Sequence, residues 1–166
     1  MVQKELLTNE QLRLAVEAKW IEHIKLCQDN FIYFVKEVWP DFICRLDPVK
    51  TRWGHHQHIA SEFTKISTMK KGRLIINMPP RHTKSEFASY LFPAWMIGKF
   101  PNLKIMQVSH NAELSSRFGS KVRNLMEQKE YKNIFGDVKL REDSKAKGRW
   151  ETNHGGEYFA AGGGGS

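Results

Sequence analysis

One stretch of the chain, residues 73–86, combines the residue types that bind phosphate. It begins with a short apolar segment, passes through two prolines, and reaches Lys84 and Ser85 where the pattern predicts the start of a helix. Amide groups at a helix start and the helix dipole both favour an anion. In such a loop the lysine reaches the β- and γ-phosphates of ATP and the serine hydroxyl binds Mg²⁺, so the stretch predicts a nucleotide site.

The loop departs from the usual P-loop pattern, G-x-x-x-x-G-K-[ST], at both glycine positions. Met78 and Thr83 stand there instead. The second glycine normally lets the backbone approach the phosphate closely, sometimes at positive φ, which a threonine resists. A proline-rich turn before an ordinary basic helix start is the alternative, and the loop alone does not decide between them.

The candidate ligands lie beyond Pro79 and Pro80, which lack an amide hydrogen and therefore end the strand predicted at residues 74–77. The candidate nucleotide-binding residues here are Arg81, His82, Thr83, Lys84, Ser85 and Glu86. A guanidinium at Arg81 beside the γ-phosphate would stabilise transition-state charge. The alternative for Arg81 is an ion pair with a carboxylate, or contact with DNA.

A second group of candidate residues precedes the loop, in the segment Trp53-Gly54-His55-His56-Gln57-His58. Three histidines within four residues are metal ligands by type. No cysteine or further histidine lies nearby at zinc-finger spacing, which argues against zinc.

Helices are predicted before the loop. Thr8 and Gln11 form a capping-box pair for a helix over residues 7–27. Apolar residues four positions apart predict one buried face on it: Leu12, Val16 and Trp20. A second helix begins near residue 30 and ends at Pro40. A third, amphipathic helix follows the histidines.

After the loop the pattern alternates between helices and strands. The helix from Ser85 to about residue 97 contains Pro93, which predicts a kink or an early end. A second parallel strand is predicted at residues 103–108. A helix over residues 112–128 has a predicted buried stripe of Leu114, Phe118, Val122 and Leu125. Its basic residues predict a DNA-contacting or simply solvated face: Arg117, Lys121 and Arg123. A loop at residues 131–137 and paired strands at residues 149–152 and 158–160 complete the prediction.

Composition limits the possibilities. With 166 residues the chain is about one domain, long enough for a real core. A net charge of +8 favours a polyanionic partner or a phosphorylated ligand over a merely basic protein. Cys27 and Cys44 do not make a disulfide framework and fit a reducing cytosol. We expect no signal peptide and no membrane span.

Three blocks of sequence follow one another between about Trp53 and the end of the chain: RLIINMPPRHTKSEFASYLFPAW, KIMQVSHNAELSSRFGSKVRNLM and LREDSKAKGRWETNHGGEYFAAG. Together they resemble the ATPase domain of large terminase subunits, the DNA-packaging motors of tailed bacteriophages. Members of that family commonly carry glycine where Thr83 stands, so this loop is a variant.

The resemblance implies an α/β fold: a P-loop NTPase core of the RecA/ASCE type, with a parallel sheet in a three-layer arrangement and a helical leader. It divides the chain into a leader or lid (1–50), a partial ATPase core (51–161) and a Gly-rich segment or Gly-Ser linker remnant (162–166). It also implies that Trp53 stacks on adenine and that Gln57 bonds the base edge, although a core tryptophan near a helix start explains the same residues equally well. Arg81 would act in cis on the transferred phosphoryl group.

In the family, a hydrophobic strand ending in an acidic pair completes Mg²⁺ coordination and positions the attacking water. No such strand follows Lys84 here, and the family's nuclease domain is absent. The resemblance therefore implies an N-terminal fragment with weak or no ATP turnover.

The intact protein would be the ATP-driven motor that moves double-stranded DNA into proheads as a homo-oligomeric ring. Its partners would be the portal and the small terminase subunit, and it would work in the host bacterial cytoplasm, transiently on the prohead, without secretion. The alternative is a catalytically incomplete module that binds another protein, such as the portal, the small terminase or a bacterial immune sensor, or DNA.

Overall fold

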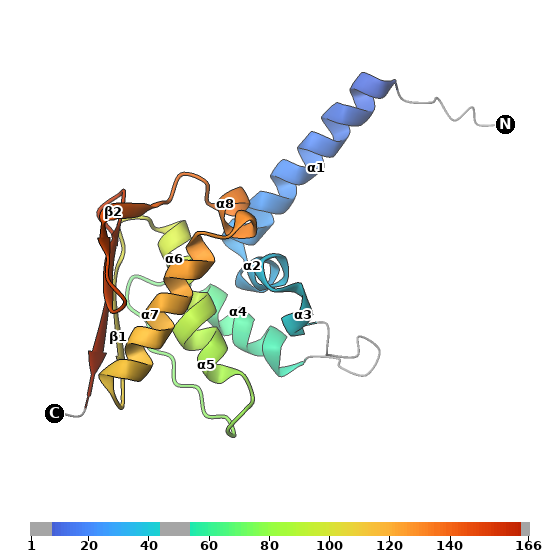
Figure 1. Cartoon of the computed structure of the whole chain (residues 1–166). Coiled ribbons are helices and arrows are strands. Elements are labelled where there is room, and N and C mark those ends of the chain that lie inside the picture. The colour runs from blue at the N-terminus through green and yellow to red at the C-terminus, as the bar shows by residue number, and fades with distance from the viewer. Residues whose placement is uncertain (1–7, 44–53, 164–166) are drawn as a thin grey trace.

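A four-stranded mixed sheet lies along one side of the molecule, with the helices packed to one side of it (Figure 1). The computed structural model describes residues 8–43 and 54–163. The helices are α1 (Asn9–Asp29), α2 (Phe31–Val38), α3 (Pro40–Ile43), α4 (His55–Ser67), α5 (Lys84–Glu86), the π-helical η1 (Phe87–Leu91), α6 (Phe92–Lys99), α7 (Ala112–Met126) and α8 (Lys129–Ile134). The strands are β1 (Lys104–Ser109), β2 (Leu140–Lys145), β3 (Arg149–Thr152) and β4 (Glu157–Gly162).

The strand order is β1-β4-β3-β2. β1 and β4 run parallel, from Lys104 opposite Glu157 to Ser109 opposite Gly162, whereas β3 pairs antiparallel with both β4 and β2. The α/β class is confirmed, but the sheet is not parallel throughout, because a short turn joins β3 to β4 and such a connection makes neighbouring strands antiparallel.

The sheet has helices on one face in the described part of the chain, rather than on both. Side chains along β1 alternate between exposed and half-buried positions. Met106 and Val108 are 69% and 53% exposed on the uncovered face, whereas Gln107 on the other face donates to the Ser89 hydroxyl. The expected three-layer arrangement is therefore a two-layer one in residues 8–43 and 54–163.

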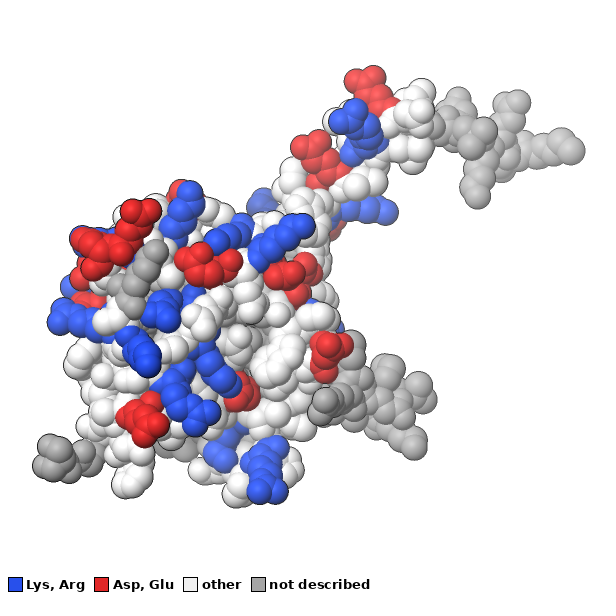
Figure 2. All heavy atoms as spheres, in the orientation of Figure 1, with Lys and Arg blue, Asp and Glu red and all other residues white. Residues whose placement is uncertain are grey.

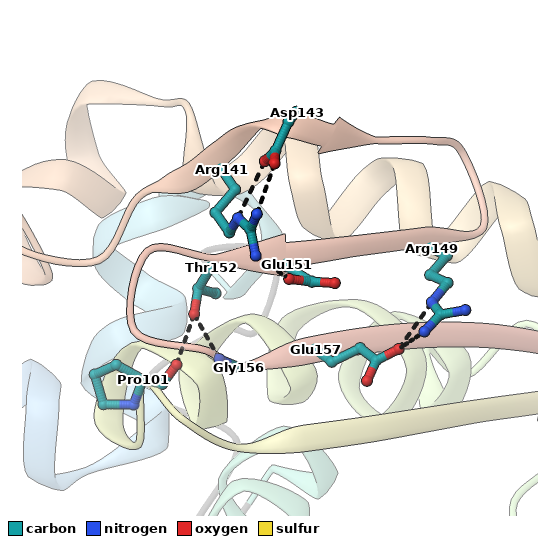
Figure 3. A network of polar contacts seen from close by, with 8 residues as sticks. All are labelled: Pro101, Arg141, Asp143, Arg149, Glu151, Thr152, Gly156 and Glu157. Atoms are coloured by element: carbon teal, nitrogen blue, oxygen red, sulfur yellow. Dashed lines mark hydrogen bonds and ion pairs between the residues drawn. The ribbon is translucent and has the colours of Figure 1, made fainter.

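Polar contacts fix the turn between β3 and β4 (Figure 3). The buried Thr152 hydroxyl donates to the Pro101 carbonyl at 2.7 Å and accepts from the Gly156 amide at 2.9 Å. The strands also carry exposed ion pairs, from Arg149 to Glu157 and from Arg141 to Asp143 and Glu151. The hydroxyl joins this turn to the segment that leads into β1.

Aromatic side chains fill the helical core. The apolar stripe of α2 is buried, and it comprises Phe31, Phe34, Val35 and Val38. Trp95 of α6 donates from its indole nitrogen to the Cys27 carbonyl at 2.9 Å. Residues 129–134, where a loop was predicted from residue 131, form α8 instead, because the buried Tyr131 packs on Phe34 and donates to the Ala94 carbonyl.

Helix α1 begins with the predicted capping box, in which Thr8 and Gln11 each bond the other's backbone amide. The predicted buried face is wrong. Val16 and Trp20 are 67% and 45% exposed, because α1 projects from the body and packs on it only near its C-terminal end (Figure 1). Among the helices of the described residues, none is long and apolar enough to cross a membrane.

The buried stripe of α7 differs from the predicted one at its N-terminal half. Ser115 and Gly119 are buried there, while Leu114 and Phe118 are not. A Cβ atom at Gly119 would lie 2.8 Å from the Tyr158 ring, so the absence of a side chain lets the helix lie directly on β4. The polarity pattern alone misses a helix face that is buried because its residues are small.

Candidate phosphate-binding site

The segment before the loop is not a strand of the described sheet. Residues 74–78 alternate between half-buried and exposed positions, and Ile75 is 84% exposed. Within the described residues no strand pairs with them. The prediction of a buried central strand at residues 74–77 is therefore wrong for the described structure: the apolar run lacks the neighbouring strands that burial on both faces requires.

The helix predicted to follow the loop is present and starts at Lys84. α5, η1 and α6 form one helical run, because the residues at both junctions keep right-handed helical dihedral angles. The expected disturbance at Pro93 takes the form of the π-helical turn immediately before it. A wider turn relieves the clash between a proline ring and the carbonyl one turn earlier, so the helix continues to Lys99.

Two loop residues have left-handed backbone conformations. Arg81 has φ of 64° and Thr83 has φ of 65°. For a β-branched residue this conformation is a genuine outlier and costs on the order of 1–3 kcal/mol. Thr83 thus adopts the backbone conformation that a glycine provides without strain, at the position where the P-loop pattern has glycine.

His56 of α4 holds Thr83 in this conformation. Its Nε2 lies 2.7 Å from the Thr83 hydroxyl, which itself donates to the His82 carbonyl. A hydroxyl that donates to the carbonyl still accepts, so Nε2 donates to it in the tautomer that carries the proton on Nε2.

Burial, with a smaller effect from His55, lowers the pKa of His56 to about 4, so the imidazole is neutral near pH 7. The ring stacks against Phe42 and Phe87. Its Nδ1 atom has no hydrogen-bond partner in the described structure. His56 therefore acts on the loop through one hydrogen bond and not through charge.

The first turn of the helix has no side-chain cap. Thr83 occupies the N-cap position, but its hydroxyl is turned away from the amides of the first turn. Those amides have no partner within a helix and attract an anion when nothing else caps them. The Lys84 ammonium lies inside the loop, donating to the carbonyls of Met78 and Pro79 at 3.2 and 3.3 Å. An ammonium has three donors, so one stays available for a ligand.

A groove of about 440 Å³ opens beside this helix start. Its walls are mostly apolar, and Lys84 and Ser85 supply polar groups: the lining residues are Phe63, Ile66, Leu74, Ile76, Lys84, Ser85, Ala88, Ser89 and Phe92. The Ser85 side chain is accessible, as a magnesium-binding hydroxyl must be.

The charge around the loop is positive. Arg81 and His82 are exposed at its tip, where His82 Nδ1 lies 2.9 Å from the Pro80 carbonyl. Glu86, the nearest acid along the helix, pairs with Lys121 of α7 at 2.9 Å. Figure 2 shows basic side chains at the tip of the loop below α5 and over α7. Lys121, one cation of the predicted basic face of α7, is therefore paired with Glu86. Glu86 is the single acid of residues 84–99, so this helical run offers no further carboxylate to Arg81 and Lys84.

Six of the eight predicted site residues, 81–86, are consecutive in the sequence, and they form the loop tip and the first turn of the helix. Gln57 is exposed on α4, next to the histidine that contacts Thr83. Trp53 lies outside the described residues, so its predicted stacking on a base stays a prediction. A zinc site of His55, His56 and His58 is disfavoured further, since His56 is buried and bonded to Thr83.

Sequence reasoning missed His56 as a positioning residue for the loop. From the sequence, the histidines were weighed only as metal ligands, because a hydrogen bond between residues 27 positions apart leaves no local pattern.

Comparison with protein-family models, with curated proteins and with solved structures finds no significant match to this chain.

Proposed function

We propose that residues 79–86 bind the triphosphate of ATP. The observation that carries the proposal is the uncapped helix start at Lys84, with the Lys84 ammonium held inside the same loop. A multiply charged anion would satisfy the first-turn amides, the helix dipole and the ammonium together. The left-handed Thr83 supports the proposal, because strained backbone conformations cluster at functional sites.

Three of the loop residues have a proposed role in binding or turnover. Lys84 binds the β- and γ-phosphates and Ser85 binds Mg²⁺, as in other loops of this type. Arg81 stabilises charge on the transferred phosphoryl group, and its exposed position lets it reach a ligand at the loop. Replacing Arg81 with alanine should then lower turnover in a hydrolytically competent protein while sparing ATP binding, and equal loss of both would assign it to binding.

We further propose that this loop belongs to a DNA-packaging ATPase of the large terminase type. The support is the resemblance of three ordered sequence blocks, the strand-helix alternation after the loop, and the net charge of +8, which suits double-stranded DNA as a partner. Oligomeric assembly on a portal, together with a small terminase subunit, is part of the same proposal.

Backbone amide spectra test the nucleotide proposal. ATP and inorganic triphosphate should both shift the amide resonances of residues 83–86, whereas adenosine should leave them in place, because the proposed recognition is of phosphate. Shifts confined to other surfaces, or equal shifts with adenosine, would contradict it.

One observation favours the second candidate, a protein-binding module. The uncovered face of the sheet exposes Met106, Val108 and Phe159, a larger apolar surface than single scattered side chains make. A module of this kind would bind its protein partner whether or not Lys84 is present, whereas nucleotide binding requires that lysine.

A further inference from the structure

Three side chains that commonly bind metal ions meet at the base of α1, away from the phosphate loop. They are His23 and Cys27 of α1 and Glu37 of α2. His23 and Cys27 are four residues apart, which places them on the same face of one helix. The next helix of the chain supplies the third group, so the cluster bridges two elements.

The distances already approach those of a metal centre. The His23 Nε2 atom lies 2.8 Å from a Glu37 carboxylate oxygen and 3.6 Å from the Cys27 sulfur, and all three ligand atoms lie within 4.8 Å of one another. Neighbouring ligand atoms around a tetrahedral zinc ion lie about 3.3–3.7 Å apart, as follows from metal–ligand distances of about 2.0–2.3 Å. The Nε2–sulfur distance falls in this range, whereas the Nε2–carboxylate distance is shorter and would lengthen when an ion binds.

The surroundings hold the ligands in place. Cys27 is fully buried, and its backbone carbonyl accepts the Trp95 indole hydrogen bond. The Trp20 ring stacks on His23 at a centroid distance of 5.8 Å. The side chains of His23 and Glu37 are 37% and 26% exposed, so an ion and a water ligand can reach the cluster from that side.

We propose that His23, Cys27 and Glu37 form a zinc-binding site that fastens α1 to α2. Sulfur, imidazole nitrogen and carboxylate oxygen together match the preference of Zn²⁺, with water as the fourth ligand. The proposal does not depend on nucleotide binding at Lys84.

Binding follows a simple proton balance. The Cys27 thiol loses its proton to solvent. The proton by which His23 Nε2 bonds Glu37 is replaced by one on Nδ1, so that a neutral imidazole coordinates through Nε2. The thiolate and the carboxylate together neutralise the ion's double charge. Burial, together with the nearby Glu37 carboxylate, raises the pKa of the Cys27 thiol to about 11 in the metal-free protein. The ion reverses this effect, since a coordinating thiol is deprotonated outright. Metal affinity should therefore fall as the pH is lowered.

Cobalt titration of the tag-free, chelator-treated whole chain tests the site. One equivalent of Co²⁺ should produce a thiolate-to-cobalt charge-transfer band and ligand-field bands of a four-coordinate ion, and Zn²⁺ should displace both. Cys27→Ser should abolish the charge-transfer band, whereas the matched variant Cys44→Ser, at the other cysteine, should retain it.

The remaining ligands provide a check that does not depend on the buried cysteine position. Glu37→Gln keeps the size of a half-buried side chain, and circular dichroism confirms that the variant is folded. It should weaken cobalt binding by at least about 100-fold. Loss of a group that only hydrogen-bonds a metal ligand already costs up to about 100-fold, and Glu37 is proposed to bind the ion directly. Unchanged affinity in Glu37→Gln would overturn the proposal. So would a charge-transfer band that survives Cys27→Ser, or cobalt bound without thiolate character, as the exposed histidines of α4 would bind it.

Discussion

Thr83 shows how one residue determines the shape of the loop. It adopts a left-handed conformation that threonine resists, and the His56 hydrogen bond together with the His82 carbonyl holds its hydroxyl. The same orientation leaves the first-turn amides without a side-chain cap. Strain and ligand-binding capacity at this loop thus have one structural origin.

A pair of variants at Thr83 measures the strain. Thr83→Gly and Thr83→Ala both lose the hydroxyl and differ only in the Cβ atom. At an ordinary position glycine is the less stable of the two, by about 0.5–1 kcal/mol. At this left-handed position the order should reverse, with glycine more stable by about 1 kcal/mol in urea unfolding. Alanine equal to or more stable than glycine would show that the backbone there is not left-handed.

His56 should make the stability of the protein depend on pH. Its folded-state pKa is about 4, against an ordinary value of 6.5, so between these values the unfolded chain binds a proton that the folded chain does not. Stability is therefore lost as the pH falls from about 6.5 to about 4, by at most about 3 kcal/mol. Above about pH 6.5 the imidazole is neutral in both the folded and the unfolded state, so it does not change the free energy of unfolding with pH.

Denaturant unfolding at several pH values measures this effect. The unfolding free energy is plotted against pH for the wild type and for His56→Gln. The difference between the two slopes separates the contribution of His56 from that of the other titrating groups. His58→Gln, at an exposed histidine of the same helix, is the matched control variant. An identical slope in His56→Gln and the wild type would remove His56 as the cause.

At the scale of elements, buried hydrogen bonds matter more than the visible ion pairs of the hairpin. Thr152 is fully buried and makes two hydrogen bonds at the β3–β4 turn, while the arginine pairs beside it are exposed to solvent (Figure 3). Exposed pairs typically contribute about 0–1 kcal/mol, whereas a buried group left without its partner costs about 1–3 kcal/mol.

The same comparison predicts the effects of two variants. Thr152→Val keeps the shape of the side chain but leaves the Pro101 carbonyl and the Gly156 amide without their hydroxyl partner, and it should cost about 1–3 kcal/mol in chemical unfolding. Arg149→Ala, which removes only an exposed pair with Glu157, should cost less than about 1 kcal/mol. A larger loss for Arg149→Ala than for Thr152→Val would contradict this order.

At the scale of the whole molecule, the mixed sheet has one covered face within the described residues, and the candidate phosphate-binding loop lies on the helical side near α4. The net charge of +8 favours the approach of anionic ligands to the loop and of nucleic acid to the surface. Met106 and Val108 on the uncovered face of the sheet, and Val16 on α1, give the described part of the chain apolar surface on two separate elements.

The sequence predicted what depends on local pattern. The capping box of α1 and the pairing of the strands at residues 149–152 and 158–160 were predicted, because each depends on residues a few positions apart. The exposure of α1 and the lack of strand partners for residues 74–78 were not predictable, because an apolar pattern does not specify which element will cover it. The His56–Thr83 bond and the cluster at Cys27 join separate elements and need the fold itself.

Calorimetric titration with Mg-ATP tests the central claim, that Lys84 and the helix start behind it bind phosphate. The wild type and Lys132→Ala, whose lysine lies on α8 and pairs with Glu127, should bind with similar affinity. Lys84→Ala should bind at least about 10-fold more weakly, since a hydrogen bond to a charged group contributes about 1.5–3 kcal/mol. Equal affinity in Lys84→Ala and the wild type would contradict the phosphate-binding role of the loop.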